Sequence, residues 1–251
     1  MTTTQTAYLY KHIQPFAPST IKAASGIWLT LQNGQKILDA TSGAAVSAIG
    51  HGNKDVTKAI VTQLDHIAYC HPGFYQTDIA QDLSTFLVNS TGGKMQKALL
   101  TGSGTFSYSS RIMLRPSLTL QTVGSEAVET AMKLSRQYFL ELSPPQPNRH
   151  RFVTRMGSWH GCTIAALAMG DFKARKHIFE PILPSNVSQV SACNVYRGLR
   201  DGETRPQYVE RLAQELDAEL LRVGPETVCA FVIEPVCGSV SKIHKVLILT
   251  E

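Results

Sequence analysis

Apolar side chains recur at three- and four-residue steps in four stretches of the chain, with polar side chains between them. That period matches one face of an α-helix, so the pattern predicts helices over residues 54–68, 77–89, 124–142 and 207–222. In the second of these helices, four apolar side chains are expected to point inward: Ile79, Leu83, Phe86 and Leu87.

Shorter runs predict a β-hairpin near the start of the chain. Residues 27–31 and 36–40 are strand-like, and Asn33-Gly34 between them is a strong signal for a tight turn. The preceding residues, 1–25, show no steady period, and we expect them to form an extended arm.

Three further apolar runs, residues 98–100, 151–155 and 228–233, predict strands. The last of them is continuously apolar, which is typical of a central strand in a parallel sheet. It places Glu234 at its C-terminal end, where ligands bind in open α/β sheets. Residues 171–204 are predicted to be rich in loops.

Composition limits the classes of function. The 251 residues carry a net charge of +5, but the basic residues are scattered, so a nucleic-acid surface is only weakly supported. No apolar run is long enough to span a bilayer. The five cysteines form no CxxC pair, which fits free, mostly buried thiols in a reducing compartment. Because residues 1–6 lack the order of a secretory signal, we expect a cytoplasmic protein without nucleic-acid or membrane partners.

Residues 124–134, Gly-Ser-Glu-Ala-Val-Glu-Thr-Ala-Met-Lys-Leu, open the third predicted helix. The first turn of a helix has N–H groups without internal partners and carries the positive end of the helix dipole. Gly124 would let a phosphate approach this backbone, and the Ser125 hydroxyl would add a donor. The pattern fits a phosphate site, although an ordinary capped surface helix is the more common reason for it.

A second group of candidate residues follows the strand at 151–155. Trp159 beside Gly161 at a strand end suits stacking on a planar ring, and a plain buried tryptophan is the alternative. Glu234 could support a ligand or be a simple loop acid. For His51, in a glycine-containing loop, a local structural role is the preferred interpretation.

Residues 124–134 closely resemble the phosphate-loop signature of class-III aminotransferases, the pyridoxal-phosphate (PLP) enzymes of fold type I. The Trp-His-Gly segment, the Glu-Pro segment and the hairpin resemble the same family in the same order. The resemblance implies an α/β fold with a mostly parallel central sheet flanked by helices. It divides the chain into an arm and hairpin of the small domain (1–52), part of the large PLP-binding domain (53–239) and a tail foreign to the family (240–251).

The resemblance also implies which residues meet the cofactor. The phosphate would be bound by Gly104, Gly124 and Ser125. Trp159 would stack on the pyridine ring, with His160 beside it and Glu234 in a supporting role. No metal is expected.

The chain departs from the family pattern at two places. Residues 105–123 intervene between Gly104 and Gly124, and they would separate the strand end from the helix start of the phosphate site. Residues 240–251 do not resemble the family's continuation, and the Schiff-base lysine has no counterpart, so no catalytic residue is assigned. The lysines present, Lys176 among them, are expected to be solvated surface residues. We hypothesise that both departures are retained introns, with a genuine surface loop as the alternative for 105–123.

The function implied by the resemblance is PLP-dependent transfer of an amino group between a small-molecule amino donor and a keto acid or aldehyde. The complete protein is expected to be a homodimer, and this chain by itself is expected to be inactive. Two alternatives stay open: a non-catalytic product that pairs with a full-length relative, and a PLP decarboxylase or racemase of the same fold. A nucleic-acid binder is a weaker third.

Overall fold

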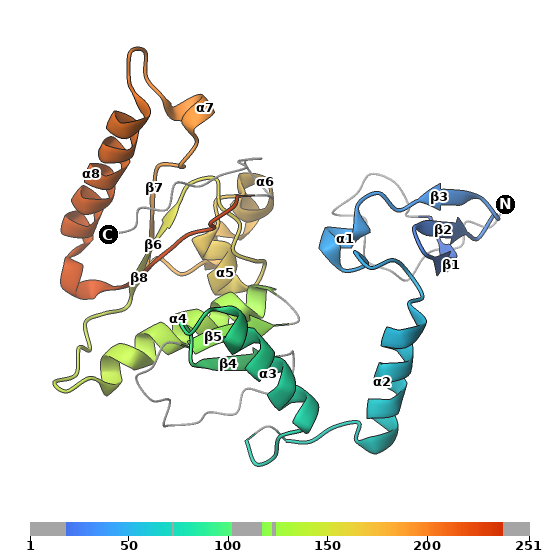
Figure 1. Ribbon diagram of the computed structural model, residues 1–251. Coiled ribbons are helices and arrows are strands. Elements are labelled where there is room, and N and C mark those ends of the chain that lie inside the picture. The colour runs from blue at the N-terminus through green and yellow to red at the C-terminus, as the bar shows by residue number, and fades with distance from the viewer. Residues whose placement is uncertain (1–18, 72, 102–116, 122–123, 238–251) are drawn as a thin grey trace. The chain divides into compact units, whose positions relative to one another are not determined.

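The computed structural model describes residues 19–71, 73–101, 117–121 and 124–237. It divides the chain into two compact units, Met1–Cys70 and His71–Glu251, whose elements are drawn in Figure 1. The predicted phosphate residue Gly104, the predicted tail 240–251 and most of the predicted insertion lie outside the described residues. The predicted domain boundary between residues 52 and 53 stays a prediction.

The first unit contains a three-stranded antiparallel sheet with the order β1-β2-β3. Its strands are β1 (Ile21–Ser25), β2 (Trp28–Leu31) and β3 (Lys36–Leu38). The predicted hairpin is confirmed, because Trp28 pairs with Leu38 and Gly34 adopts a φ of 88°, which favours glycine. Part of the predicted arm is not isolated, since β1 pairs along β2.

One carboxylate organises the loop after the hairpin, around the short helix α1 (Ser42–Ala45). Asp39 accepts hydrogen bonds from Ser42 N–H at 2.9 Å and Ser47 Oγ at 3.1 Å, and its Oδ2 lies 2.8 Å from His51 Nε2. The hydrogen bond with His51, followed by that from Ser42, lowers the pKa of Asp39 to about 2. His51 therefore has a local structural partner in this loop.

Helix α2 (Lys54–His66) ends the first unit and confirms the predicted helix. It begins at Asn53, whose Oδ1 accepts the N–H groups of Asp55 and Val56 at 3.1 Å each. None of its residues is buried, and Ile60 on the apolar face is 56% exposed. The sequence period thus fixes which face is apolar, while no described part of the first unit covers that face.

The second unit begins with helix α3 (Asp78–Ser90) and strand β4 (Lys97–Thr101), both of which confirm predicted elements. The inward orientation predicted for Ile79, Leu83 and Phe86 is wrong, because these side chains are 53%, 42% and 70% exposed. Helical spacing gathers apolar side chains on one face, but their burial depends on a neighbouring segment that the described structure does not supply.

A strand that the sequence did not predict lies inside the predicted insertion. Residues 117–121 form β5 (Ser117–Gln121), which pairs with β4 in parallel from Lys97↔Ser117 to Thr101↔Gln121. This part of the segment is therefore not a loop. The long helix α4 (Gly124–Glu141) follows β5 and confirms the helix predicted there.

A parallel sheet with the order β7-β6-β8 forms the centre of the second unit. Its strands are β6 (Arg151–Arg155), β7 (Val187–Val190) and β8 (Val228–Val232). The runs predicted at 151–155 and 228–233 are confirmed as strands. Among the described residues, β8 pairs only with β6 and lies at an edge of this sheet.

Helices cover both faces of this sheet (Figure 1). Val153 packs in a cluster with Leu216 and Leu220 of α8 (Arg205–Val223). The next residue, Thr154, donates from Oγ1 to the Met169 carbonyl of α5 (Ile164–Met169) at 2.9 Å. Because neighbouring residues of a strand point to opposite faces, α8 and α5 lie on opposite sides of the sheet.

The segment 171–204, predicted to be rich in loops, contains several short elements besides β7. These are helix α6 (Lys173–Lys176), the 3₁₀ turn η1 (His177–Ile182) and helix α7 (Val195–Gly198). A second 3₁₀ turn, η2 (Pro225–Thr227), leads from α8 into β8. The sequence signal was weak here because each element spans only four to six residues.

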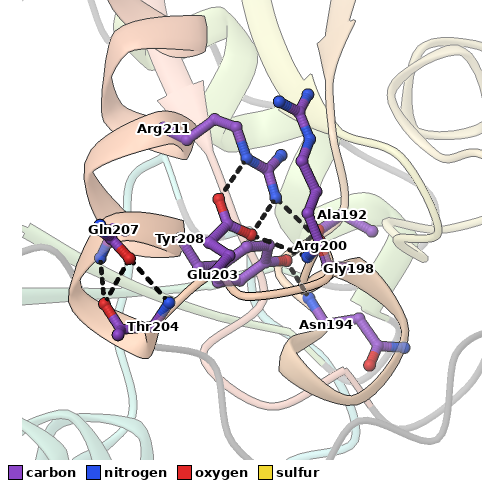
Figure 2. A network of polar contacts seen from close by, with 9 residues as sticks. All are labelled: Ala192, Asn194, Gly198, Arg200, Glu203, Thr204, Gln207, Tyr208 and Arg211. Carbon is purple, nitrogen blue, oxygen red and sulfur yellow. Dashed lines mark hydrogen bonds and ion pairs between the residues drawn. The ribbon is translucent and has the colours of Figure 1, made fainter.

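Figure 2 shows the polar network that fixes the start of α8. Tyr208 is 1% exposed, donates from its hydroxyl to the Ala192 carbonyl at 3.1 Å and accepts the Asn194 N–H at 2.9 Å. Burial raises the pKa of Tyr208. Beside it, Arg211 binds the Glu203 carboxylate with two hydrogen bonds, of 2.7 and 2.8 Å. These bonds anchor the segment between β7 and α8.

Candidate functional site

The first turn of α4 lies against the loop that follows β6. Ser125 is 7% exposed, and its Oγ accepts the Cys162 N–H at 2.9 Å. The Cys162 Sγ lies 3.5 Å from the same oxygen. Because Oγ is the acceptor for the backbone N–H, the serine proton stays available, and sulfur is a weak partner for it.

The close approach of helix and loop requires a glycine at position 161. Gly161 has a φ of 137°, in the region that favours glycine. A Cβ at this position would lie 2.6 Å from the Oγ of Ser125 and 2.7 Å from its Cα. Both the backbone conformation and the available space therefore exclude a side chain here.

A second side chain of α4 binds the same loop one turn later. Glu129 Oε1 accepts the N–H groups of Ala165 and Ala166, at 2.9 and 3.2 Å. These amides belong to the first turn of α5, where backbone N–H groups lack helical partners. Since Ser125 and Glu129 are four residues apart on one helix face, α4 binds residues 162–166 at two points.

The ends of two neighbouring strands bring Trp159 and Glu234 together. Glu234 follows β8, and its Oε1 accepts a hydrogen bond from the Trp159 N–H. The two residues are 75 positions apart in the sequence. They meet because β6 and β8 are parallel neighbours, whose C-terminal ends lie at the same edge of the sheet.

His160 is a buried histidine without a partner for one ring nitrogen. Its side chain is 7% exposed, and Nε2 makes no hydrogen bond to any residue that the structure describes. Burial lowers the pKa of His160, so the ring is neutral at pH 7. A buried polar atom left without a partner is uncommon, which makes this nitrogen available to a ligand.

The structure thus brings four of the predicted site residues to one region: Ser125, Trp159, His160 and Glu234. Gly124 begins α4, and a Cβ there would meet no described atom within 4 Å. Sequence reasoning missed the supporting role of Glu129, although its position four residues after Ser125 was a usable signal.

One prediction about the lysines is wrong. Lys176 is not a solvated surface residue, because its Nζ donates to the carbonyls of Ala168 and Gly170 at 2.9 Å each. Burial lowers its pKa. Since these carbonyls lie at the C-terminal end of α5, the ammonium group caps that helix end. The sequence could not show this contact, because α6 folds back onto α5 only in the tertiary structure.

The five cysteines are all free, but only Cys193 and Cys237 are buried. The prediction that the thiols are mostly buried is therefore wrong, since Cys162 is exposed and the remaining two are half-buried. Within the described ranges, no group of three or more His, Cys, Asp or Glu residues is placed to bind a metal ion. Nor does any described helix have the length and apolar character needed to cross a membrane.

A separate hollow lies between α3 and β4, open to solvent and with a volume of about 490 Å³. It contains none of the predicted site residues. Its lining consists of Gln76, Ala80, Gln81, Ser84, Thr85, Val88, Asn89, Gln96, Lys97, Ala98 and Leu100.

Comparison with known proteins gives a consistent result. The family model described as "Aminotransferase class-III" matches residues 10–245. An aminotransferase of Gibberella zeae is 40% identical over 92% of this chain, and an uncharacterized aminotransferase of Schizosaccharomyces pombe is 38% identical over 92%. The matches cover 42% and 46% of those proteins, so the chain spans somewhat less than half of their length.

The fold is similar to that of solved transaminases. An amine transaminase from an uncultivated Pseudomonas species, in its PLP-bound form, superposes with a TM-score of 0.74 at 24% identity. The similarity covers 97% of this chain and 49% of that structure. The described fold is therefore part of the α/β fold type I of PLP enzymes. Because the family model matches almost the whole sequence, the chain belongs to the class-III aminotransferases, a family whose cofactor is pyridoxal phosphate.

Proposed function

We propose that this chain binds PLP and that it contributes to the transfer of an amino group between a small-molecule amino donor and a keto acid or aldehyde. The observation that carries the proposal is the contact between α4 and the loop after β6. Through Ser125 and Gly161, this contact places the positive end of an 18-residue helix beside Trp159 and His160. PLP carries a phosphate and a flat ring on one molecule. The helix N-terminus suits the phosphate, and Trp159 suits the ring.

The residues present fit the cofactor. The Ser125 hydroxyl has a proton to donate, and Gly124, which has no side chain, lets a phosphate oxygen approach the helix amides. Gly104, which lies outside the described residues, stays a proposed third contact. At the other end of the site, the unpaired Nε2 of His160 is available for a polar group of the ring.

PLP, when bound, supplies an electron-withdrawing ring that takes up the electrons released as a bond to the amine-bearing carbon breaks. The protein's part is to bind and orient that ring. Trp159 would cover one of its faces, and Glu234 acts behind Trp159 by binding its backbone N–H. Glu129 acts in the same indirect way by binding the loop to α4.

The phosphate part of the proposal is tested by comparing PLP with pyridoxal, which lacks the phosphate. Binding is followed by quenching of Trp159 fluorescence in a Trp28→Phe background, where Trp159 is the only indole. Ser125→Ala removes a donor to a charged group, so we expect PLP to bind about 10- to 100-fold more weakly. Pyridoxal affinity should stay unchanged.

Ser135→Ala is the matched control, because Ser135 is also on α4 but donates only to the Ala131 carbonyl of its own helix. It should leave both affinities unchanged. The proposal fails if wild-type chain shows no preference for PLP over pyridoxal, or if Ser125→Ala weakens both ligands equally.

We also propose that this chain by itself transfers no amino group. Burial lowers the pKa of Lys176, but its ammonium group already donates to two carbonyls. Formation of a keto acid from an amino acid by the purified chain with PLP would contradict this. The five free cysteines support a cytoplasmic location, which stays part of the proposal.

A second candidate function is pairing with a longer relative of the family, as part of a dimer. The exposed apolar side chains of α2 and α3, such as Ile60 and Phe86, favour it, because such faces are normally covered. Co-expression with a full-length relative and size-exclusion chromatography would test it. Elution of the chain only as a free monomer would count against pairing.

A further inference from the structure

The hollow between α3 and β4 is large enough to hold a small molecule. Its volume of about 490 Å³ falls within the range of about 300–1,000 Å³ that is usual for ligand pockets. Two neighbouring elements of the second unit form it (Figure 1), and none of the residues proposed to bind PLP lines it. A ligand in this hollow would therefore occupy a site of its own.

Small and apolar side chains form the floor of the hollow. On α3, Ala80, Ser84 and Val88 follow one another at four-residue steps, so they lie on one face of the helix. On β4, Ala98 and Leu100 are two positions apart and lie on one face of the strand. All five residues are half-buried. Because three of them are alanine or serine, the floor leaves room between the helix and the strand.

The rim of the hollow is polar throughout. It consists of six exposed residues, Gln76, Gln81, Thr85, Asn89, Gln96 and Lys97. Gln81 Nε2 donates to Thr85 Oγ1 at 3.2 Å, which leaves the Gln81 side-chain oxygen as an acceptor and the Thr85 hydroxyl as a donor. The side-chain amides of Gln76 and Asn89 make no hydrogen bond to any residue that the structure describes. The rim thus offers both donors and acceptors.

Helix α3 presents polar side chains to the hollow and apolar ones elsewhere. Ile79, Leu83 and Phe86 are exposed, and none of them lines the hollow. A helix that packs on a strand only to bury surface would present this apolar face to the strand. The observed orientation leaves amide and hydroxyl groups around the hollow, where they need a polar partner such as water or a ligand.

The types of residue around the hollow limit the class of ligand. The described residues that line it include one charged side chain, Lys97, and neither an acid nor an aromatic ring. Without an acid the site does not suit a cation, and without a ring it does not suit stacking on a flat base. Amides both donate and accept, as is required to bind the hydroxyl groups of a sugar, and a lysine pairs with an anionic group.

We propose that this hollow binds a small polyhydroxylated anion, either a sugar acid or a sugar phosphate. The amides of Gln76 and Asn89 bind its hydroxyl groups, and Lys97 pairs with its carboxylate or phosphate. The two sources share one chemistry, a chain of hydroxyl groups that ends in a negative charge. This inference goes beyond the proposed function and does not depend on PLP.

Isothermal titration calorimetry of the wild-type chain with four ligands of equal carbon-chain length tests the class of ligand. Gluconate and sorbitol 6-phosphate are the two candidate anions, sorbitol lacks the charge, and hexanoate lacks the hydroxyl groups. We expect at least one candidate anion to bind saturably, and sorbitol and hexanoate to bind about tenfold more weakly. The anion that binds identifies the source. The inference is overturned if neither anion binds, or if sorbitol or hexanoate binds as tightly.

Variants of the lining test the location. Lys97→Met should weaken binding of the anion about tenfold and leave sorbitol binding unchanged. Lys94→Met is the matched control, because Lys94 is three residues away and does not line the hollow, and its affinity should stay within about twofold of wild type. Equal losses in the two variants would reveal a general charge effect and overturn the inference.

Two further variants test the floor and the rim. Ser84→Leu adds volume to the floor and should abolish binding. Asn89→Leu changes only the exposed rim and should weaken binding about tenfold, and circular dichroism checks that both variants keep their helices. Unchanged affinity in Asn89→Leu and Lys97→Met would overturn the inference, whatever the result for Ser84→Leu.

A last comparison separates this site from the proposed phosphate site on α4. Affinity for the anion should be unchanged in Ser125→Ala, and a loss as large as that in Lys97→Met would place the anion at α4 and overturn the inference. PLP binding, measured by equilibrium dialysis, should be the same in Lys97→Met as in wild type. Absence of PLP binding in wild type would concern the proposed function alone.

Discussion

The contact between α4 and the loop after β6 depends on the absence of a side chain at Gly161, and Gly161→Ala tests it. The added methyl would lie 2.6 Å from the Oγ, 2.7 Å from the Cα and 2.8 Å from the Cβ of Ser125. The Cα is backbone, so rotating the serine side chain cannot relieve the clash. The loop and the first turn of α4 must therefore move apart.

Three costs combine in this substitution. A non-glycine residue in this backbone region costs about 1–3 kcal/mol. Extra volume in a packed contact costs about 1–3 kcal/mol. Separation of the two segments removes the hydrogen bond from Cys162 N–H to Ser125 Oγ, about 0.5–1.5 kcal/mol. Together these costs give an expected loss of about 2.5–7.5 kcal/mol, a large part of the stability of about 5–15 kcal/mol that is typical of a domain.

Urea unfolding followed by Trp159 fluorescence in the Trp28→Phe background measures this loss in the second unit. Gly124→Ala is the control, because a Cβ there meets no described atom within 4 Å, and its stability should stay within about 1 kcal/mol of wild type. Gly161→Ala should also weaken PLP binding, since Ser125 is displaced. A free energy of unfolding for Gly161→Ala within about 1 kcal/mol of wild type would refute the steric argument.

Three other predictions concern the second unit. In Gly198→Ala the new Cβ would lie 2.6 Å from the Tyr208 hydroxyl, so the free energy of unfolding in urea should fall by about 1–3 kcal/mol. In the double variant with Tyr208→Phe, the total loss should be smaller than the sum of the two single losses. The hydrogen bond from Arg211 lowers the pKa of Glu203 to about 2, so the stability that this pair contributes is complete above pH 4.5 and is lost as the pH falls from 4.5 to 2. In Glu203→Gln, the urea midpoint should no longer fall over this pH range. A midpoint that depends on pH in Glu203→Gln as it does in wild type would contradict the prediction. Burial lowers the pKa of His160, so the unfolded chain binds a proton more readily than the folded one as the pH falls below 6.5. The free energy of unfolding, measured in urea, should therefore decline below pH 6.5, and this decline should be absent in His160→Gln.

Much of the local structure could be predicted because its causes are local. The Asn33-Gly34 turn, the helical periods of α2, α3, α4 and α8 and the apolar runs of β6 and β8 are written in neighbouring residues. Short elements in residues 171–204 were missed, since four to six residues carry too little periodicity. The orientation of Ile79 and Phe86 was also missed, because burial depends on what packs against a helix.

By itself, the sequence determined that residues 124–134 begin a helix and that Trp159, His160 and Glu234 follow strands. Only the tertiary structure decided that these residues form one region. Parallel pairing of β6 with β8 brings Glu234 to the Trp159 N–H, and the missing side chain of Gly161 brings Ser125 to the Cys162 N–H. The physical reason is that hydrogen bonds and close contacts between distant segments depend on how strands and helices pack, which no local pattern specifies.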